Sequence, residues 1–139
     1  MNSSGPQRSP GFHLWHAALR WRSAVQDALG DRLTATQFFV LGAIAWLGKT
    51  SGAPTQAQVA DFSATDPMTT SQVVRALEKR GLLVRTDDPH DSRSWRLGVT
   101  PTGRALVKEC AALVREVDRA FFAGLDANTL TRLEKLHER

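Results

Sequence analysis

The sequence has a single cysteine among its 139 residues, which excludes a disulfide within the chain. Disulfide-free chains are typical of reducing compartments, so we expect a cytoplasmic protein. No apolar run reaches the roughly 18 residues of a membrane-spanning helix, so we expect no membrane partner. The first ten residues, MNSSGPQRSP, lack the apolar stretch of a signal peptide. Their Gly, Pro and Ser content predicts a disordered tail over residues 1–10.

The rest of the chain has the composition of an ordinary globular protein, with 42% hydrophobic and 23% charged residues. Its length predicts one domain, which we place at residues 11–139. The net charge of +4 is compatible with an anionic partner, nucleic acid above all. Many proteins of this charge bind no nucleic acid, so the charge alone does not decide the function.

Helical periodicity predicts the first half of the fold. Apolar residues recur at helical spacing on two sides of residues 12–29, which predicts a helix buried on both sides and ended by Gly30. Thr34 and Gln37 have the spacing of a capping box, in which each side chain bonds a free backbone N–H at a helix start. The segment FFVLGAIAWL that follows is apolar on all sides and predicts the core helix of the domain.

Two short helices with a tight turn come next. Thr55 and Gln58 repeat the capping-box spacing and begin a helix that extends to about Phe62. Asp66-Pro67 supplies an N-cap and a proline at the first helical position, and the helix that follows stops at Gly81. A turn over residues 63–66 between two such helices is typical of a helix-turn-helix.

The remaining elements complete a winged helix. Residues 82–86 and 94–99 are rich in Leu and Val and predict a β-hairpin with a long tip. Thr100-Pro101 begins a helix whose apolar seam consists of Leu106, Cys110, Leu113, Val117 and Phe121. Asp126 can cap a last helix that carries Leu130, Leu133 and Leu136 on one side. We therefore predict a mainly α fold with a small β-hairpin wing (α+β), in which residues 11–30 and 101–139 form a dimerisation region.

Residues 66–106 resemble the MarR family of bacterial winged-helix transcription regulators. The matching motifs are LEKRGL at 77–82, Asp91-Ser92-Arg93 in the wing, and Val99-Thr100-Pro101-Thr102-Gly103 entering the next helix. The resemblance extends over residues 12–138, with Val99 where the family usually has Leu and Trp95 where it usually has an aliphatic residue. It implies a ligand-responsive repressor, without a cofactor or enzymatic activity, that binds a pseudo-palindromic operator in double-stranded DNA as a homodimer.

In a helix-turn-helix the second helix enters the major groove, with residues 33–100 forming the DNA-binding winged helix. We expect Val73, Val74 and Leu77, together with Thr70 or Ala76, on its buried side. The predicted DNA-binding residues on its other side are Met68, Thr69, Ser71, Gln72, Arg75 and Lys79. Gln72 can bond adenine and Arg75 guanine through two hydrogen bonds each, whereas Lys79 and Arg80 are placed to meet phosphate.

The loop at 87–97, DDPHDSRSWRL, is the predicted wing. The resemblance implies that Arg93 inserts into the minor groove, where narrow A·T-rich segments attract arginine. Asp91 would hold Arg93 in place, or a neighbouring arginine such as Arg85, and Arg96 would contact phosphate.

Three other interpretations of these residues are weaker. The side chains of His90, Asp91 and Ser92 are consecutive and diverge, whereas a catalytic triad needs three side chains that converge on one atom. Cys110 lies on an apolar seam, where a thiol is mostly inert, so a redox switch is not favoured. His13 and His16 have a metal-ligand spacing, but two ligands are too few for a zinc site.

The resemblance also implies a small aromatic effector, and its candidate pocket residues are Trp15, His16, Arg20 and Trp46. A cation beside indole rings suits an aromatic acid. The alternative is that these tryptophans are part of the dimer core. The rival function for the whole chain is a winged-helix protein–protein interaction module, whose basic face docks an acidic partner without binding DNA sequence-specifically.

Overall fold

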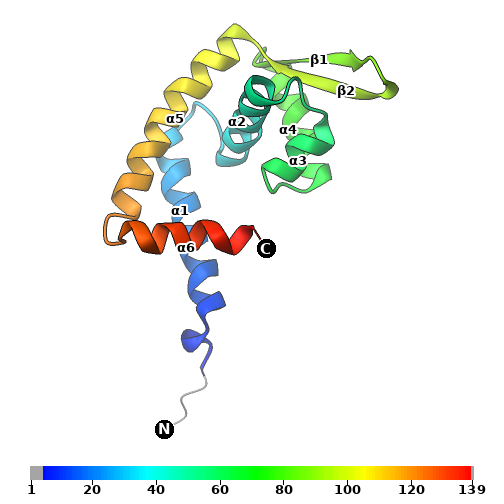
Figure 1. The fold of residues 1–139 in the computed structure, drawn as a ribbon. Helices are drawn as coiled ribbons and strands as arrows, with labels where there is room; N and C mark the ends of the chain where they lie inside the picture. Colours follow the sequence, from blue (N-terminus) through cyan, green and yellow to red (C-terminus); the bar gives the residue numbers. More distant parts are fainter. Residues whose placement is uncertain (1–4, 139) are drawn as a thin grey trace. The chain divides into compact units, whose positions relative to one another are not determined.

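The computed structural model describes residues 5–138, which form helices and one two-stranded antiparallel sheet (Figure 1). The elements are η1 (Pro6–Arg8), α1 (Pro10–Leu29), α2 (Ala35–Thr50), α3 (Gln56–Phe62), α4 (Pro67–Lys79), β1 (Leu83–Asp88), β2 (Asp91–Val99), α5 (Pro101–Phe121) and α6 (Ala127–His137). The predicted mainly α fold with a hairpin wing is confirmed. Within residues 5–138, every helix is too short or too polar to span a bilayer. The chain divides into two compact units, one of which is Leu29–Ala112.

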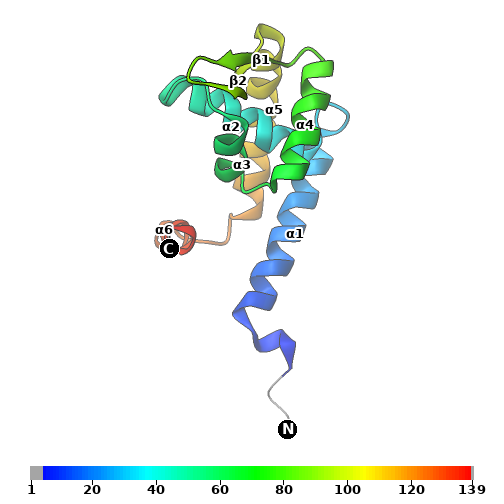
Figure 2. The same ribbon diagram turned by 90° about the vertical axis from the view of Figure 1, so that its right-hand side faces the viewer.

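The unit Leu29–Ala112 is built around α2, the predicted core helix. Both halves of the capping box are present: Gln37 N–H donates to the Thr34 hydroxyl and Thr34 N–H donates to the Gln37 side chain, both at 3.0 Å. The helix contacts α3, α4 and β2 (Figure 2). Val40, Leu41 and Ile44 are completely or almost completely buried there. Apolar side chains on several sides of one helix therefore supply the centre of this unit.

The helix-turn-helix forms as its capping residues predict. Thr55 and Gln58 make the second capping box, and Asp66 accepts the Thr69 N–H at 2.8 Å to begin α4. Of the two residues that the sequence left open, Thr70 is buried and Ala76 is exposed. Thr70 tolerates burial because its hydroxyl donates to the Asp66 carbonyl at 2.8 Å.

The long hairpin tip is a wrong prediction. The strands extend to Asp88 and from Asp91, so the turn itself is only Pro89–His90. The register pairs Asp87 with Trp95 but Asp88 with Asp91, which leaves residues 92–94 without a partner in β1. This bulge places the extra residues inside β2 instead of in a loop. The sequence also did not predict that the segment before α3 pairs with β2, where Leu97 N–H donates to the Pro54 carbonyl at 2.9 Å.

Two glycines join the wing to its neighbours. Gly81 ends α4 with φ +73°, a left-handed conformation that glycine adopts readily, as the sequence predicted. Gly103, in the first turn of α5, lies so close to β1 that a Cβ atom there would be 2.0 Å from the Leu82 carbonyl oxygen. The hydroxyl of Thr100 donates to the Gly81 carbonyl at 2.7 Å and accepts the Gly103 N–H at 3.0 Å.

The other unit comprises the chain up to Ala28 and the chain from Leu113 onward. Residues 1–4 of the predicted tail lie outside the described residues. The remainder is more ordered than predicted, because Pro6–Arg8 form a turn of 3-10 helix and Pro10 begins α1. The missed signal is Ser9-Pro10, since the Ser9 hydroxyl accepts the Phe12 N–H at 3.3 Å in the manner of a helix cap.

Burial on both sides of α1 is also a wrong prediction for the single chain. Leu14, Trp15 and Leu19 are about half exposed or more, whereas Val25 near the end of the helix is completely buried. The Trp21 indole N–H donates to the Asp118 carboxylate of α5 at 2.7 Å. Asp126 caps α6 as predicted, by accepting the Thr129 N–H at 2.7 Å.

Candidate nucleic-acid interface

One side of α4 presents an exposed stripe of long side chains. The stripe consists of Met68, Gln72, Arg75 and Lys79, which follow one another at steps of four, three and four residues and are all exposed. Met68 has 72% of its surface accessible, an unusual exposure for an apolar side chain. The opposite side is anchored by Thr70, Val74 and Leu77, which are buried. The stripe therefore contains four of the six predicted DNA-binding residues of this helix.

The first turn of α4 is held by Asp66. Hydrogen bonds from the Thr69 hydroxyl and then from the Thr69 N–H lower the pKa of this carboxyl. The hydroxyl of Thr69 is thus engaged in capping, and Thr69 and Ser71 are both only partly exposed. The DNA contacts of Thr69 and Ser71 stay predictions, and the Thr69 hydroxyl would have to leave Asp66 to donate to DNA.

The end of α4 is tied to the segment before α2. Arg80 donates from its guanidinium to the Arg32 carbonyl at 2.8 Å and to the Gln37 side chain at 3.4 Å. The structure therefore gives Arg80 a supporting contact where the sequence predicted a phosphate contact. Lys79, one residue earlier, is exposed on the stripe.

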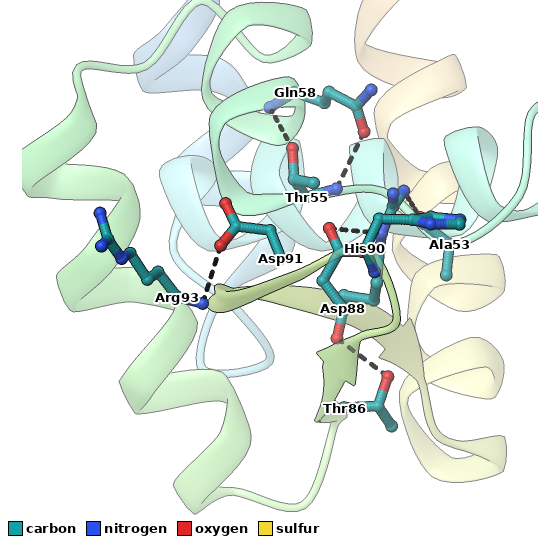
Figure 3. Close-up of polar contacts among 9 residues, drawn as sticks. Ala53, Thr55, Gln58, Thr86, Asp88, His90, Asp91 and Arg93 are labelled. Carbon is teal, nitrogen blue, oxygen red and sulfur yellow. Dashed lines mark hydrogen bonds and ion pairs between the residues drawn. The ribbon is translucent and has the colours of Figure 1, made fainter.

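Arg93 lies at the end of the wing, on the bulge formed by residues 92–94. Its backbone N–H donates to the Asp91 carboxylate at 2.9 Å, and its side chain extends away from that carboxylate (Figure 3). Asp91 thus holds Arg93 through its backbone N–H and leaves the guanidinium of Arg93 unbound by that carboxylate. Among residues 5–138, the Arg93 guanidinium has no hydrogen-bond or ion-pair partner, which leaves it free for a ligand outside the chain.

Arg96 joins the turn of the wing to the segment before α3. Its Nε lies 3.2 Å from a carboxylate oxygen of Asp88, and its Nη1 donates to the Ala53 carbonyl at 2.9 Å. Asp88 is only 8% exposed and accepts the His90 N–H at 2.9 Å. This hydrogen bond, and then the Arg96 charge, hold the pKa of Asp88 below its usual range against the opposing effect of burial. The sequence did not predict this pair, although the Asp-Pro-His order of the turn hinted at a carboxylate-capped turn.

Arg85 joins the wing to α4. Its Nε and Nη2 donate to the two carboxylate oxygens of Glu78 at 2.9 and 3.0 Å, and its guanidinium lies 5.1 Å from the ring centroid of Trp95. The sequence offered Arg85 only as an alternative to Arg93 for the partner of Asp91, and it did not single out Glu78. A helix residue and a strand residue seven positions apart give no local pattern that would identify the pair.

The weaker interpretations find no geometric support in the described part of the chain. His90, Asp91 and Ser92 are all exposed, and Asp91 faces the backbone of Arg93. Cys110 is buried, and burial raises the pKa of its thiol, which disfavours the reactive thiolate. Over residues 5–138 there is no cluster of three or more His, Cys, Asp or Glu side chains that could hold a metal.

The four predicted pocket residues belong to different units: Trp15, His16 and Arg20 lie on α1, and Trp46 lies on α2. All four are exposed, and none of them lines either of two apolar hollows in the described chain. One hollow, in Leu29–Ala112, has a volume of about 650 Å³, apolar walls from α2 and β2, and two cations, Lys49 and Arg104. The other, of about 610 Å³, is an almost wholly apolar hollow between α1 and the last two helices.

Comparison with known proteins identifies the family. The model of the MarR family matches residues 33–95. YdcH of Bacillus subtilis (strain 168), an uncharacterized HTH-type transcriptional regulator, is 38% identical over 136 residues, which cover 96% of this chain and 92% of that protein. The HTH-type transcriptional repressor NicR of Pseudomonas putida is 28% identical over 83% of this chain and 72% of its own length.

The fold agrees with this similarity. The solved structure of Bordetella bronchiseptica BpsR, whose DNA binding is regulated by 6-hydroxynicotinic acid, superimposes with a TM-score of 0.86. It is 29% identical and covers 99% of this chain and 96% of that one. The chain has the helix-turn-helix and the hairpin wing, matches the family model, and is 38% identical to YdcH over nearly its whole length. It therefore belongs to the MarR family of transcriptional regulators, which are DNA-binding proteins and not enzymes.

Proposed function

We propose that this protein is a ligand-responsive transcriptional repressor that binds a specific operator in double-stranded DNA as a homodimer. The observation that carries the proposal is that some polar side chains of the winged helix are free while others are bound within the protein. The stripe of α4 and the guanidinium of Arg93 are exposed, whereas other arginines of the same region are engaged within the protein. The free hydrogen-bond donors lie on α4 and on the wing, so a DNA duplex can accept from the first in its major groove and from the second in its minor groove.

The stripe contacts bases in the major groove. Gln72 bonds adenine and Arg75 bonds guanine, each through two hydrogen bonds, and the Met68 side chain suits the methyl group of thymine. Lys79, at the end of the stripe, contacts phosphate and sets the register. Arg93 enters the adjacent minor groove, where a narrow A·T-rich segment concentrates negative potential.

The homodimer is supported by the apolar surface of the chain ends, residues 11–30 and 101–139. Its large side chains with at least about two-fifths of their surface exposed are Leu14, Trp15, Leu19, Leu125, Leu133 and Leu136. An exposed apolar surface of this kind on a small domain favours association, and a second copy of the chain would bury it. Two-fold symmetry then requires a pseudo-palindromic operator, with half-sites about one helical turn apart. We place the protein in the cytoplasm, where its DNA would be.

The effector is an aromatic acid, the class to which the regulator of BpsR belongs. Trp15, His16, Arg20 and Trp46 remain candidates for binding it, and the hollow that contains Lys49 and Arg104 offers apolar walls with cationic groups in one unit. Such a ligand lowers DNA affinity only if it binds better to a conformation in which the two recognition helices no longer fit successive grooves.

Selection of bound duplexes from a random DNA pool, at about 0.15 M salt, tests the proposed function. The expected result is a palindromic consensus with half-sites about ten base pairs apart. Recovery of no consensus, with binding that vanishes as salt rises, would overturn it, because phosphate contacts alone behave in that way. The winged helix would then be an interaction module for an acidic protein.

A further inference from the structure

The residues Glu78, Arg85 and Trp95 link the recognition helix to the wing. Glu78 lies on α4, Arg85 on β1 and Trp95 on β2, and each neighbouring pair is in contact. All three belong to the unit Leu29–Ala112. We name them the wing clamp.

The geometry of the wing clamp is specific. Arg85 binds Glu78 through two parallel N–H···O bonds of 2.9 and 3.0 Å, an arrangement that fixes the plane of the guanidinium as well as its position. In the hairpin, Arg85 pairs with Leu97, so Trp95 is its diagonal neighbour on the same face. The indole therefore covers a guanidinium that the helix has already oriented, at 5.1 Å from its ring centroid.

Trp95 also borders the bulge on the side away from the tip. It pairs with Asp87, residues 92–94 between it and the tip have no partner, and Asp91 pairs with Asp88 on the other side of the bulge. Arg93 is the middle residue of this bulge. A bulge re-aims the side chains it contains, and their direction depends on how its two ends are held. The wing clamp holds one end, and the Asp88–Arg96 pair holds the other.

We propose that the wing clamp is a positioning device: it fixes the wing relative to α4, so that Arg93 reaches the minor groove while the stripe occupies the major groove. Trp95 and Glu78 are positioning residues, which act through Arg93 and need not contact DNA. This inference about DNA rests on the proposed function. The part that concerns the free protein does not.

The free protein is tested first. Spin labels at Ala76→Cys on α4 and Ser92→Cys at the tip report the distance between helix and wing, because both positions are exposed while the native Cys110 is buried. The expected result is a narrow distance distribution that broadens with Trp95→Leu and with Glu78→Gln. Trp95→Phe keeps an aromatic face beneath Arg85 and should preserve the narrow distribution. Val84→Ala is the matched control, because Val84 is exposed on the other face of the same hairpin. Distributions unchanged by Trp95→Leu and Glu78→Gln would overturn the proposal.

DNA binding is tested next, with a double-mutant cycle on the selected operator. Arg93→Ala should lower affinity about tenfold, as expected for loss of one close contact with DNA. Trp95→Leu should lower it nearly as much in the wild-type protein, and by less than about twofold once Arg93 is already alanine, since residues that act through one another are not additive. Additive losses would overturn the coupling, because they would mean that Trp95 acts independently of Arg93.

Failure of the proposed function and failure of the proposed coupling give different results. If the wild-type protein prefers no DNA sequence, the proposed function fails, and the spin-label distances still decide whether the wing clamp positions the wing. If the wild-type protein binds its operator and the cycle is additive, only the proposed coupling fails. Thermal unfolding of each variant, with Val84→Ala as reference, separates both results from loss of folded protein.

Discussion

Some arginines of the winged helix bind other groups of the protein, and others are free. The bound arginines support the fold, and the free ones are available to contact DNA. Arg80, Arg85 and Arg96 donate to groups of the protein: a carbonyl before α2, the carboxylate of Glu78, and the carbonyl of Ala53. Arg75 and Arg93 are exposed, without hydrogen-bond or ion-pair partners within residues 5–138. A planar guanidinium that is already bound has fewer donors for a base or a phosphate. We therefore propose that Arg75 and Arg93, the two arginines left free, are the ones that contact DNA.

At the scale of residues, Gln72 is the sharpest test of base recognition. Gln72→Ala removes an exposed amide from the middle of the stripe, without a partner in the helix to disturb. We expect it to relax base preference at one position in each half-site, with a discrimination of about 1–3 kcal/mol lost there. Repeating the selection from random DNA with the variant measures this directly. An equal loss of affinity for every sequence would show instead that Gln72 contacts only the backbone.

The elements themselves show which parts of the fold can be predicted from sequence. Both capping boxes and the Asp66-Pro67 helix start were predicted correctly, because each signal is complete within four neighbouring residues. The length of β1 and β2 was not, since the strands extend to a turn held by the Asp88–Arg96 pair and by the bond from Arg96 to the Ala53 carbonyl. The bond from Arg96 to Ala53 joins residues 43 positions apart, so no local pattern contains it.

The candidate site shows the same limit. The exposed stripe of α4 follows from helical periodicity, and its position was predicted. The partner of Arg85 was not: Asp91 was expected to hold Arg93 or a neighbouring arginine such as Arg85, and Arg85 instead meets Glu78. Opposite charges are abundant in this region, and only the three-dimensional register of helix against strand decides which of them are neighbours.

At the scale of elements, the approach of α5 to β1 depends on Gly103. Gly103→Ala would place a methyl group 2.0 Å from the Leu82 carbonyl oxygen, so the backbone must move. We expect the free energy of unfolding to fall by about 1–3 kcal/mol or more, as for other overpacked sites. Gly42→Ala is the matched control, because nothing lies within 4 Å of its Cβ position in α2. It should stabilise the helix by about 0.5–1 kcal/mol. Urea unfolding of the two variants compares them, and equal stabilities would contradict the close approach.

The turn of the wing should keep the hydrogen bond of Asp88 below the pH at which an ordinary aspartate is protonated. Hydrogen bonding by His90 N–H and the charge of Arg96 lower the pKa of Asp88 in the folded protein. A lowered folded-state pKa stabilises the wing at every pH above the ordinary aspartate value of about 3.9, and this contribution is lost as the pH falls through the lowered value. In a pH titration followed by NMR, the amide resonance of His90 should therefore change only at pH values below the ordinary pKa of aspartate. Asp88→Asn keeps an acceptor and should abolish the change. A midpoint at or above the ordinary value would contradict the buried pair.

At the scale of the whole molecule, the apolar chain ends predict association. One chain has a mass of 15.3 kDa, and light scattering should give twice that value at micromolar concentration. Leu133→Glu combined with Leu136→Glu places charges on two exposed apolar positions of α6 and should yield the single-chain mass. Glu134→Gln is a control on the same helix. A monomeric wild-type protein would remove the reason for expecting a palindromic operator.

The proposed repressor depends on sequence-specific DNA binding, which a titration against two duplexes measures. The wild-type protein is titrated against its selected operator and against a shuffled duplex of the same length and composition, at about 0.15 M salt. We predict an affinity at least about 10³-fold higher for the operator, the range in which specific regulators exceed their own nonspecific binding. Equal affinities for the two duplexes, falling with the same slope as salt is added, would contradict it.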